Sequence, residues 1–121
     1  MDLENMDLWD QRELAENPNT PVDVLRDLAT EEDGWIRRYV ATNPSTPLDV
    51  LRDLAKDEEL GVRWSVTLNS NASSKILVMM FEYEKSLREP DEDVIKVLYA
   101  HKNFPAFAKR VLETLFGEML P

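Results

Sequence analysis

Cysteine is absent from this chain of 121 residues, and other residue types on which chemistry commonly depends are scarce. Without cysteine there is no disulfide, no thiolate-bound zinc or iron–sulfur cluster and no thiol nucleophile. The single histidine, His101, has no nucleophile in its sequence context that would indicate catalysis. The three glycines, Gly34, Gly61 and Gly117, are too dispersed for a phosphate-binding loop. These absences predict a protein that is not an enzyme and uses neither a cofactor nor a metal ion.

Long apolar runs are also missing. The longest, Ile76 to Phe81, spans six residues, whereas crossing a bilayer requires roughly 18. The acidic amino terminus lacks the basic and apolar regions of a secretion signal. We therefore expect a soluble, cytoplasmic protein that does not interact with a membrane.

Basic residues are outnumbered, with 14 Lys and Arg against 24 Asp and Glu, for a net charge of −10. The excess lies in residues 1–61, which hold 16 acids and 6 bases, while the remainder is balanced. Because nucleic-acid binding requires a basic surface, this charge argues against DNA or RNA as a direct ligand. It is compatible with a basic protein partner, and equally with a charge that only maintains solubility.

Internal repetition is the most informative positive feature. The sequence NPNTPVDVLRDLA, residues 17–29, returns as NPSTPLDVLRDLA at residues 43–55, a period of 26. The preceding segments WDQRELAENP and WIRRYVATNP match at the same offset, and a weaker copy covers residues 61–77. A period of this length is typical of a solenoid. With 43% hydrophobic residues, the composition fits one globular domain, residues 1–121, with repeats over 9–77.

Each copy is predicted to form two short helices. Thr20 and Thr46 are suitable N-caps, and Pro21 and Pro47 suit the first helical position. The preceding helix must end before Asn43, because the residue before a proline avoids the helical conformation. Helices this short are marginal alone and require burial against neighbouring copies.

The carboxyl-terminal part, residues 78–121, is predicted to be a diverged repeat with capping helices. Helices are expected over residues 73–88, from residue 90 onward, and over residues 105–117. The segment DVIKVLYAHKNFP faintly echoes the repeat, with Lys96 near the position of Arg37 but in a slipped register.

The repeated motif resembles the leucine-rich repeat variant (LRV) family of bacteria over residues 9–77. The matching residues are Arg37, Val40, Ala41, Asn43, Pro44, Thr46, Pro47, Leu51, Leu54 and Ala55. The resemblance implies alternating α- and 3₁₀-helices in a right-handed superhelix, related to HEAT-type arrays, that serves as a binding scaffold. The cysteine-bound iron–sulfur cluster described beside such repeats cannot be carried over, because this chain has no cysteine. The predicted fold is therefore all-α, a right-handed α-solenoid of short two-helix repeats with period 26 and a longer helical carboxyl-terminal cap.

Two groups of charged residues are candidate partner contacts. The first is a repeated ladder, consisting of Asp23, Arg26, Asp27, Asp49, Arg52 and Asp53. Arginines in such a ladder can bind partner carboxylates, although a solvated face with weak internal ion pairs is the alternative.

The second group is Arg37, Arg38 and Arg63, interleaved with Trp35, Tyr39 and Trp64. Arginine and aromatic residues dominate binding hot spots. The alternative is that the aromatics fill the core and the arginines bridge to the acidic clusters at residues 31–33, 57–59 and 91–93. These clusters lack the spacing of a calcium loop and are expected to cap helices.

Three functions fit these observations. The first is a non-enzymatic scaffold that mediates protein–protein interaction. The second is an acidic nucleic-acid mimic or phage-type inhibitor of a DNA-binding protein, suggested by the charge of residues 1–61. The third is a homodimer formed through residues 76–83, which offer apolar side chains almost all round a helix; the alternative is that this segment is the central helix of the cap, covered by the two helices that follow. A monomer and a homodimer both remain open.

Overall fold

The computed structural model describes residues 2–120, and within that range it consists of eight α-helices and one short 3₁₀-helix without any strand. The elements are η1 (Leu3–Asn5), α1 (Leu8–Glu16), α2 (Val22–Leu28), α3 (Gly34–Thr42), α4 (Leu48–Leu54), α5 (Leu60–Thr67), α6 (Ser74–Ser86), α7 (Glu92–Ala100) and α8 (Ala106–Phe116). The all-α prediction is confirmed. None of the helices in the described part of the chain has the length and apolar character needed to cross a membrane.

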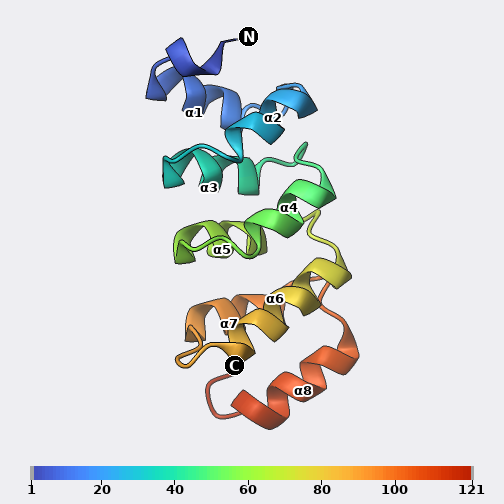
Figure 1. Ribbon diagram of the computed structural model, residues 1–121. Helices are drawn as coiled ribbons and strands as arrows, with labels where there is room; N and C mark the ends of the chain where they lie inside the picture. The colour runs from blue at the N-terminus through green and yellow to red at the C-terminus, as the bar shows by residue number, and fades with distance from the viewer. Residues whose placement is uncertain (1, 121) are drawn as a thin grey trace.

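The helices follow one another down the molecule as four pairs (Figure 1). The first helices of the pairs, α1, α3, α5 and α7, pack side by side. The second helices, α2, α4, α6 and α8, form the other layer and lie farther from one another. Helix α6 has 13 residues where α2 and α4 have 7, so the fourth pair follows at a longer interval along the chain.

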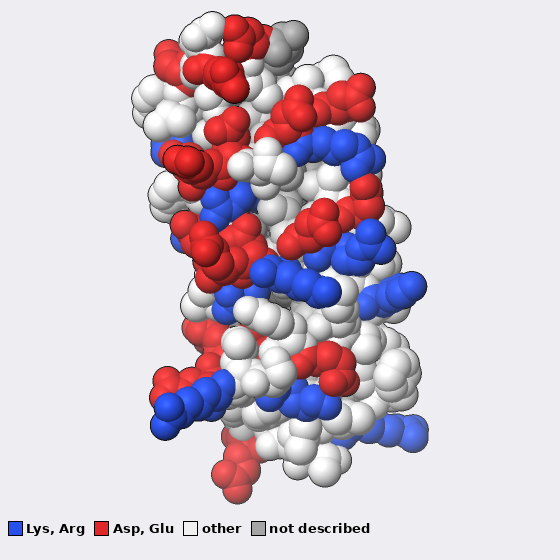
Figure 2. Space-filling view, viewed as in Figure 1, with Lys and Arg blue, Asp and Glu red and all other residues white. Residues whose placement is uncertain are grey.

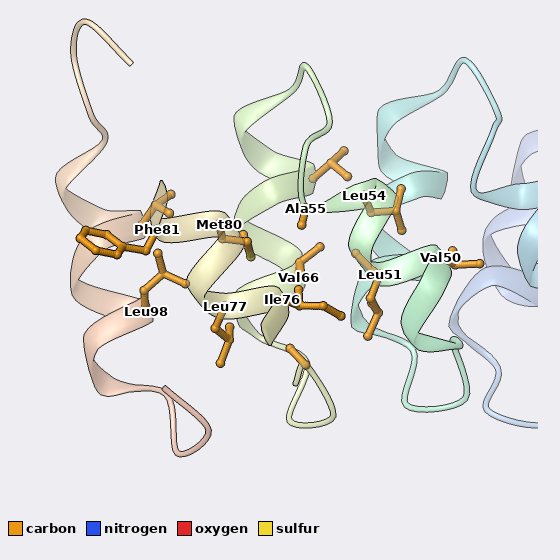
Figure 3. Close-up of a cluster of buried hydrophobic side chains, with 14 of the residues drawn as sticks. Val50, Leu51, Leu54, Ala55, Val66, Ile76, Leu77, Met80, Phe81 and Leu98 are labelled. Carbon is orange, nitrogen blue, oxygen red and sulfur yellow. The ribbon is translucent and has the colours of Figure 1, made fainter. Parts of the chain in front are cut away.

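One continuous cluster of buried side chains links the pairs, from Ala15 in α1 to Leu112 in α8. Side chains of α4, α5, α6 and α7 point into the space between these helices (Figure 3). Helix α6 buries most of its apolar residues in this cluster, namely Ile76, Leu77, Met80 and Phe81. Full burial of each such side chain contributes about 1.5–3 kcal/mol. The apolar segment predicted over residues 76–83 is therefore used within the chain itself.

The helix ends show which local predictions hold. Ser73 caps α6 through a bond from the Ile76 amide, and α8 ends at Phe116, beside the expected Gly117. Helix α7 begins at Glu92 with Asp91 as its N-cap, two residues later than expected. Of the acidic clusters, Asp33 and Asp91 supply caps, whereas no side chain caps α5.

The predicted N-caps Thr20 and Thr46 are wrong. Pro21 and Pro47 occupy the N-cap positions of α2 and α4 and provide no side-chain bond. The buried threonine hydroxyls instead donate backward, from Thr20 Oγ1 to the carbonyl of Leu14 (2.6 Å) and from Thr46 Oγ1 to that of Val40 (2.7 Å). Both carbonyls lie in the last turn of the preceding helix, where the usual amide donor four residues on is missing; the carbonyl of Val40 also accepts from the Asn43 amide (3.1 Å).

A ladder of asparagine side chains joins the loops of successive pairs. Asn43 Nδ2 donates to the carbonyls of Ala15 (2.8 Å) and Asn17 (2.9 Å). Asn69 Nδ2 makes the same two bonds 26 residues later, to the carbonyls of Ala41 (2.9 Å) and Asn43 (3.0 Å). Both asparagines are buried, and three of these four bonds, to the carbonyls of Ala15, Ala41 and Asn43, are buried as well, where a polar group requires a partner within the protein.

His101 occupies the next rung in place of an asparagine. Its Nε2 lies 3.0 Å from the carbonyl of Asn69, and its Nδ1 accepts a bond from the Asn103 amide (3.0 Å). The carbonyl can only accept and the amide only donate, so the ring carries its proton on Nε2. With His101 matched to Asn43, Lys96 corresponds to Arg38 and Ile95 to Arg37, which corrects the alignment of Lys96 with Arg37.

The last pair ends the core with polar side chains. On the same alignment, Lys109 and Glu113 of α8 replace the buried Leu51 of α4 and its buried C-cap residue Ala55. The Tyr99 hydroxyl donates to Glu113 (2.9 Å), and this hydrogen bond raises the pKa of the phenol above its ordinary value. The face of α8 at these positions is therefore more polar than the matching face of α4.

Candidate protein-binding surfaces

The predicted ladder lies on the exposed side of the second helices. Arg26 of α2 donates to the carboxylate of Asp49 on α4, joining the two pairs. This hydrogen bond raises the pKa of the Arg26 guanidinium and lowers the pKa of the Asp49 carboxyl. Both side chains are exposed, so the pair stabilises the fold only weakly.

The ladder does not continue into the third pair. Asp23, Asp27 and Asp53 are exposed and make no ion pair among residues 2–120. Arg52 is the counterpart of Arg26, but the counterpart of Asp49 is Lys75, which lines the same cavity as Arg52. Over the molecule as a whole, acidic side chains dominate the upper half, and basic side chains form a band across the middle (Figure 2).

Two of the predicted contact arginines lie inside the molecule. Arg37 and Arg63 are each only 8% exposed. Arg37 binds Asp57 through Nε (2.8 Å) and donates to the carbonyls of Glu31 and Glu32. The hydrogen bond with Asp57 raises the pKa of the Arg37 guanidinium.

Arg63 repeats this arrangement one pair later. Its Nε binds the buried Glu84 (2.9 Å), and it donates to the carbonyls of Asp57 and Glu58. At the amino-terminal end, Gln11 serves the corresponding loop by donating to the carbonyls of Leu3 (2.9 Å) and Met6 (3.0 Å). Because Arg37 and Arg63 use their donors internally, they hold the loops between pairs and do not offer a contact surface.

Arg38 differs from Arg37, because it is only half-buried and lies beside an exposed tryptophan. Its guanidinium stacks on the ring of Trp35, 4.3 Å from the ring centroid, and Trp35 is 54% exposed. The same pairing occurs one pair earlier, where Arg12 lies 5.7 Å from the ring of Trp9, which is 73% exposed. Arg12 also lies 3.6 Å from Asp33.

These residues form a surface that we call the tryptophan face. It comprises Leu8, Trp9, Arg12, Trp35, Arg38 and Leu60 on α1, α3 and α5. Exposed aromatic and leucine side chains recur here at related positions of successive first helices, and apolar residues grouped in this way mark interaction sites more often than single scattered ones do.

Gly61 shapes the lower end of the tryptophan face. A side chain there would collide with the guanidinium of Arg38, which lies against the glycine. Two hollows meet at this point and share Arg38, Leu60 and Gly61. One, of about 450 Å³, extends toward Trp35, and the other, of about 400 Å³, extends toward Trp64. The arginine thus lies at the centre of a shallow groove with aromatic residues at both ends.

Sequence reasoning singled out Trp35 and Arg38 but missed Trp9 and Arg12. The signal was present, because both residues precede their counterparts by the repeat period of 26. It was not decisive, since a tryptophan in a small protein is more often buried than exposed.

The described part of the chain contains no group of three or more His, Cys, Asp or Glu side chains placed to hold a metal ion. Both ring nitrogens of His101 are engaged in the loop ladder. No family model matches the chain, and comparisons with curated proteins and with solved structures give no match. The surfaces described above therefore carry the functional argument.

Proposed function

We propose that this chain is an α-solenoid of four helix pairs, built on a period of 26 residues, that works as a non-catalytic scaffold for a protein partner. The recurring asparagine rungs and the buried arginine bridges support this architecture. Its expected location is the cytoplasm. The observation that carries the function is the tryptophan face, where two exposed tryptophans each have an arginine stacked beside them.

The composition of the tryptophan face suits protein recognition. Tryptophan and arginine are enriched among the few residues that supply most of the binding energy of an interface. Each stacked arginine holds its planar group over the ring, so a partner meets an ordered surface and less conformational entropy is lost on binding.

The rim of the tryptophan face indicates the charge of the partner. Asp10, Glu13 and Glu59 lie on or beside the same helices and are exposed or half-buried. Glu59 lines the hollow next to Arg38. A partner that presents apolar side chains flanked by Lys or Arg would complement this pattern.

The test is quantitative affinity capture from a lysate of the native cells. The wild-type chain is compared with the double variant Trp9→Ser/Trp35→Ser and with Leu68→Ser, which removes a 56% exposed leucine outside the tryptophan face. Loss of a hot-spot tryptophan costs about 2 kcal/mol or more, which is about thirtyfold in affinity. We expect a protein that is retained by the wild type and by Leu68→Ser but lost with the double variant.

A second variant separates binding from folding. Gly61→Ala displaces Arg38 from its position, while the alanine favours helix α5 by about 1 kcal/mol. We expect weaker binding with no loss of stability. Equal capture by all variants, or by none, would refute the proposal.

The acidic-mimic function remains the second candidate, and the charge of the upper half supports it (Figure 2). It predicts capture of a DNA-binding protein that is insensitive to the tryptophan substitutions and lost at moderate salt. The tryptophan-dependent interaction should survive the same salt, because apolar burial is not screened.

A further inference from the structure

A separate cavity opens between α4 and α6 in the layer of second helices. Its volume is about 350 Å³, and its lining is mainly apolar. Leu48 forms one wall and is half exposed, Ile76 lies buried at the base, and Met79 is partly buried on the other wall. Methionine adapts its shape to different apolar groups. The cavity can accept one large apolar side chain, since its volume lies near the lower limit for ligand sites.

Two cations border this cavity, and neither forms an ion pair within residues 2–120. They are Arg52 of α4 and Lys75 of α6, and both are exposed. At the corresponding place one pair earlier, Arg26 binds Asp49. Asp49 also borders the cavity, but its carboxylate is occupied by Arg26. The replacement of an aspartate by Lys75 therefore leaves two like charges beside an apolar pocket, in a chain whose net charge is −10.

Each cation would gain from an external carboxylate. Lys75 stands in the first turn of α6, where the helix end favours a negative charge and no acidic residue is present. Arg52 has a planar group that can bind a carboxylate through two parallel hydrogen bonds. An anion between them would replace repulsion by attraction, as Asp49 does for Arg26.

We propose that this cavity binds an acidic, apolar peptide segment of a protein partner. One apolar side chain of the segment enters between Leu48, Ile76 and Met79, and a neighbouring carboxylate lies between Arg52 and Lys75. Leu48, Arg52 and Lys75 at the border of the cavity are exposed, so a continuous chain lying across α4 and α6 can reach the apolar space and both cations together. This site is distinct from the tryptophan face, and either proposal can fail without the other.

The test uses three probe peptides that differ only in charge: acetyl-Gly-Glu-Phe-Glu-Gly-amide and its counterparts with Gln or Lys in place of Glu. Binding is followed by methyl NMR of Leu48, Ile76 and Met79 in the full chain. We expect saturable shifts with the Glu peptide, binding weaker by about tenfold with the Gln peptide, and no binding with the Lys peptide.

A charge replacement gives the sharpest variant. Lys75→Asp supplies Arg52 with the same partner that Arg26 has, so it should reduce binding of the Glu peptide by about tenfold or more. Lys56→Asp is the matched control, because it makes the same change in charge on an exposed residue that does not line the cavity. It should leave binding within about twofold.

Several outcomes would overturn the inference. Equal binding of the Glu and Gln peptides, or an equal loss in both aspartate variants, would show that the two cations do not form the site. Binding of 4-phenylbutyrate at the same methyl groups without binding of any peptide would make the occupant a free carboxylate. Retention of Glu-peptide binding by Trp9→Ser/Trp35→Ser would support this site even if no partner of the tryptophan face is found.

Discussion

Replacing Asn43 with alanine tests the asparagine ladder directly. The substitution removes a buried hydrogen bond to the carbonyl of Ala15 and a partly buried one to the carbonyl of Asn17. It also removes the bond that Asn43 Oδ1 accepts from the Ser45 amide. Each buried bond contributes about 1 kcal/mol net, and each carbonyl left without a partner adds a desolvation cost. We therefore expect the free energy of unfolding to fall by about 2–4 kcal/mol, a large part of the 5–15 kcal/mol typical of a domain.

The chain offers a matched control for this measurement. Asn17 is the first asparagine of this series, and within residues 2–120 its exposed side chain only accepts a bond from the Asn19 amide (2.9 Å). Asn17→Ala should therefore cost about 0.5 kcal/mol or less, as is usual for surface substitutions. Both variants are measured by urea unfolding followed by circular dichroism, with an unchanged denaturant slope as the criterion that the unfolded states are comparable. Equal losses in the two variants would refute the structural role of the ladder.

Three further predictions follow from the buried and paired groups. His101→Asn should preserve stability to within about 1 kcal/mol, because asparagine fills the other rungs, whereas His101→Ala should lose about 2 kcal/mol or more in thermal and urea unfolding. Arg63→Leu should cost about 3–5 kcal/mol by leaving the buried Glu84 without its partner. The double variant Arg63→Leu/Glu84→Leu should recover part of that loss, and no recovery would contradict the pairing. Because Arg26 lowers the pKa of the Asp49 carboxyl, the stabilisation from this pair should be present above the unfolded pKa of about 3.9 and be lost as the pH falls through the lower folded value. An NMR titration of Asp49 should show the shift in the native chain and its disappearance in Arg26→Gln.

The candidate surfaces show how far sequence reasoning extends. The ladder of Asp23, Arg26 and their counterparts was predicted to be exposed because its members lie on the polar side of an amphipathic helix. The sequence does not show which of two neighbouring arginines is buried. Arg37 and Arg38 are adjacent in sequence, yet one lies in the interior and the other at the surface. Adjacent helical residues point about 100° apart, so the rotation of α3 against its neighbours decides which arginine is buried.

His101 illustrates the same limit. In the sequence it is an isolated histidine without a catalytic context, and its match to Asn43 is hidden because α6 is longer than α2 and α4. Its function in the loop ladder becomes evident only when its two ring nitrogens are seen beside Asn69 and Asn103.

The sequence by itself determined the helical class, the approximate limits of most helices and the apolar stripes that they bury. These features depend on local spacing, on prolines and on capping residues, which act within a few positions of the chain. Only the tertiary structure decided the direction of the threonine hydroxyls, the burial of Arg37 and Arg63, the exposure of Trp9 and Trp35, and the cavity between α4 and α6. Each of these depends on how one helix is rotated and spaced against another, and that arrangement comes from packing between residues far apart in the sequence.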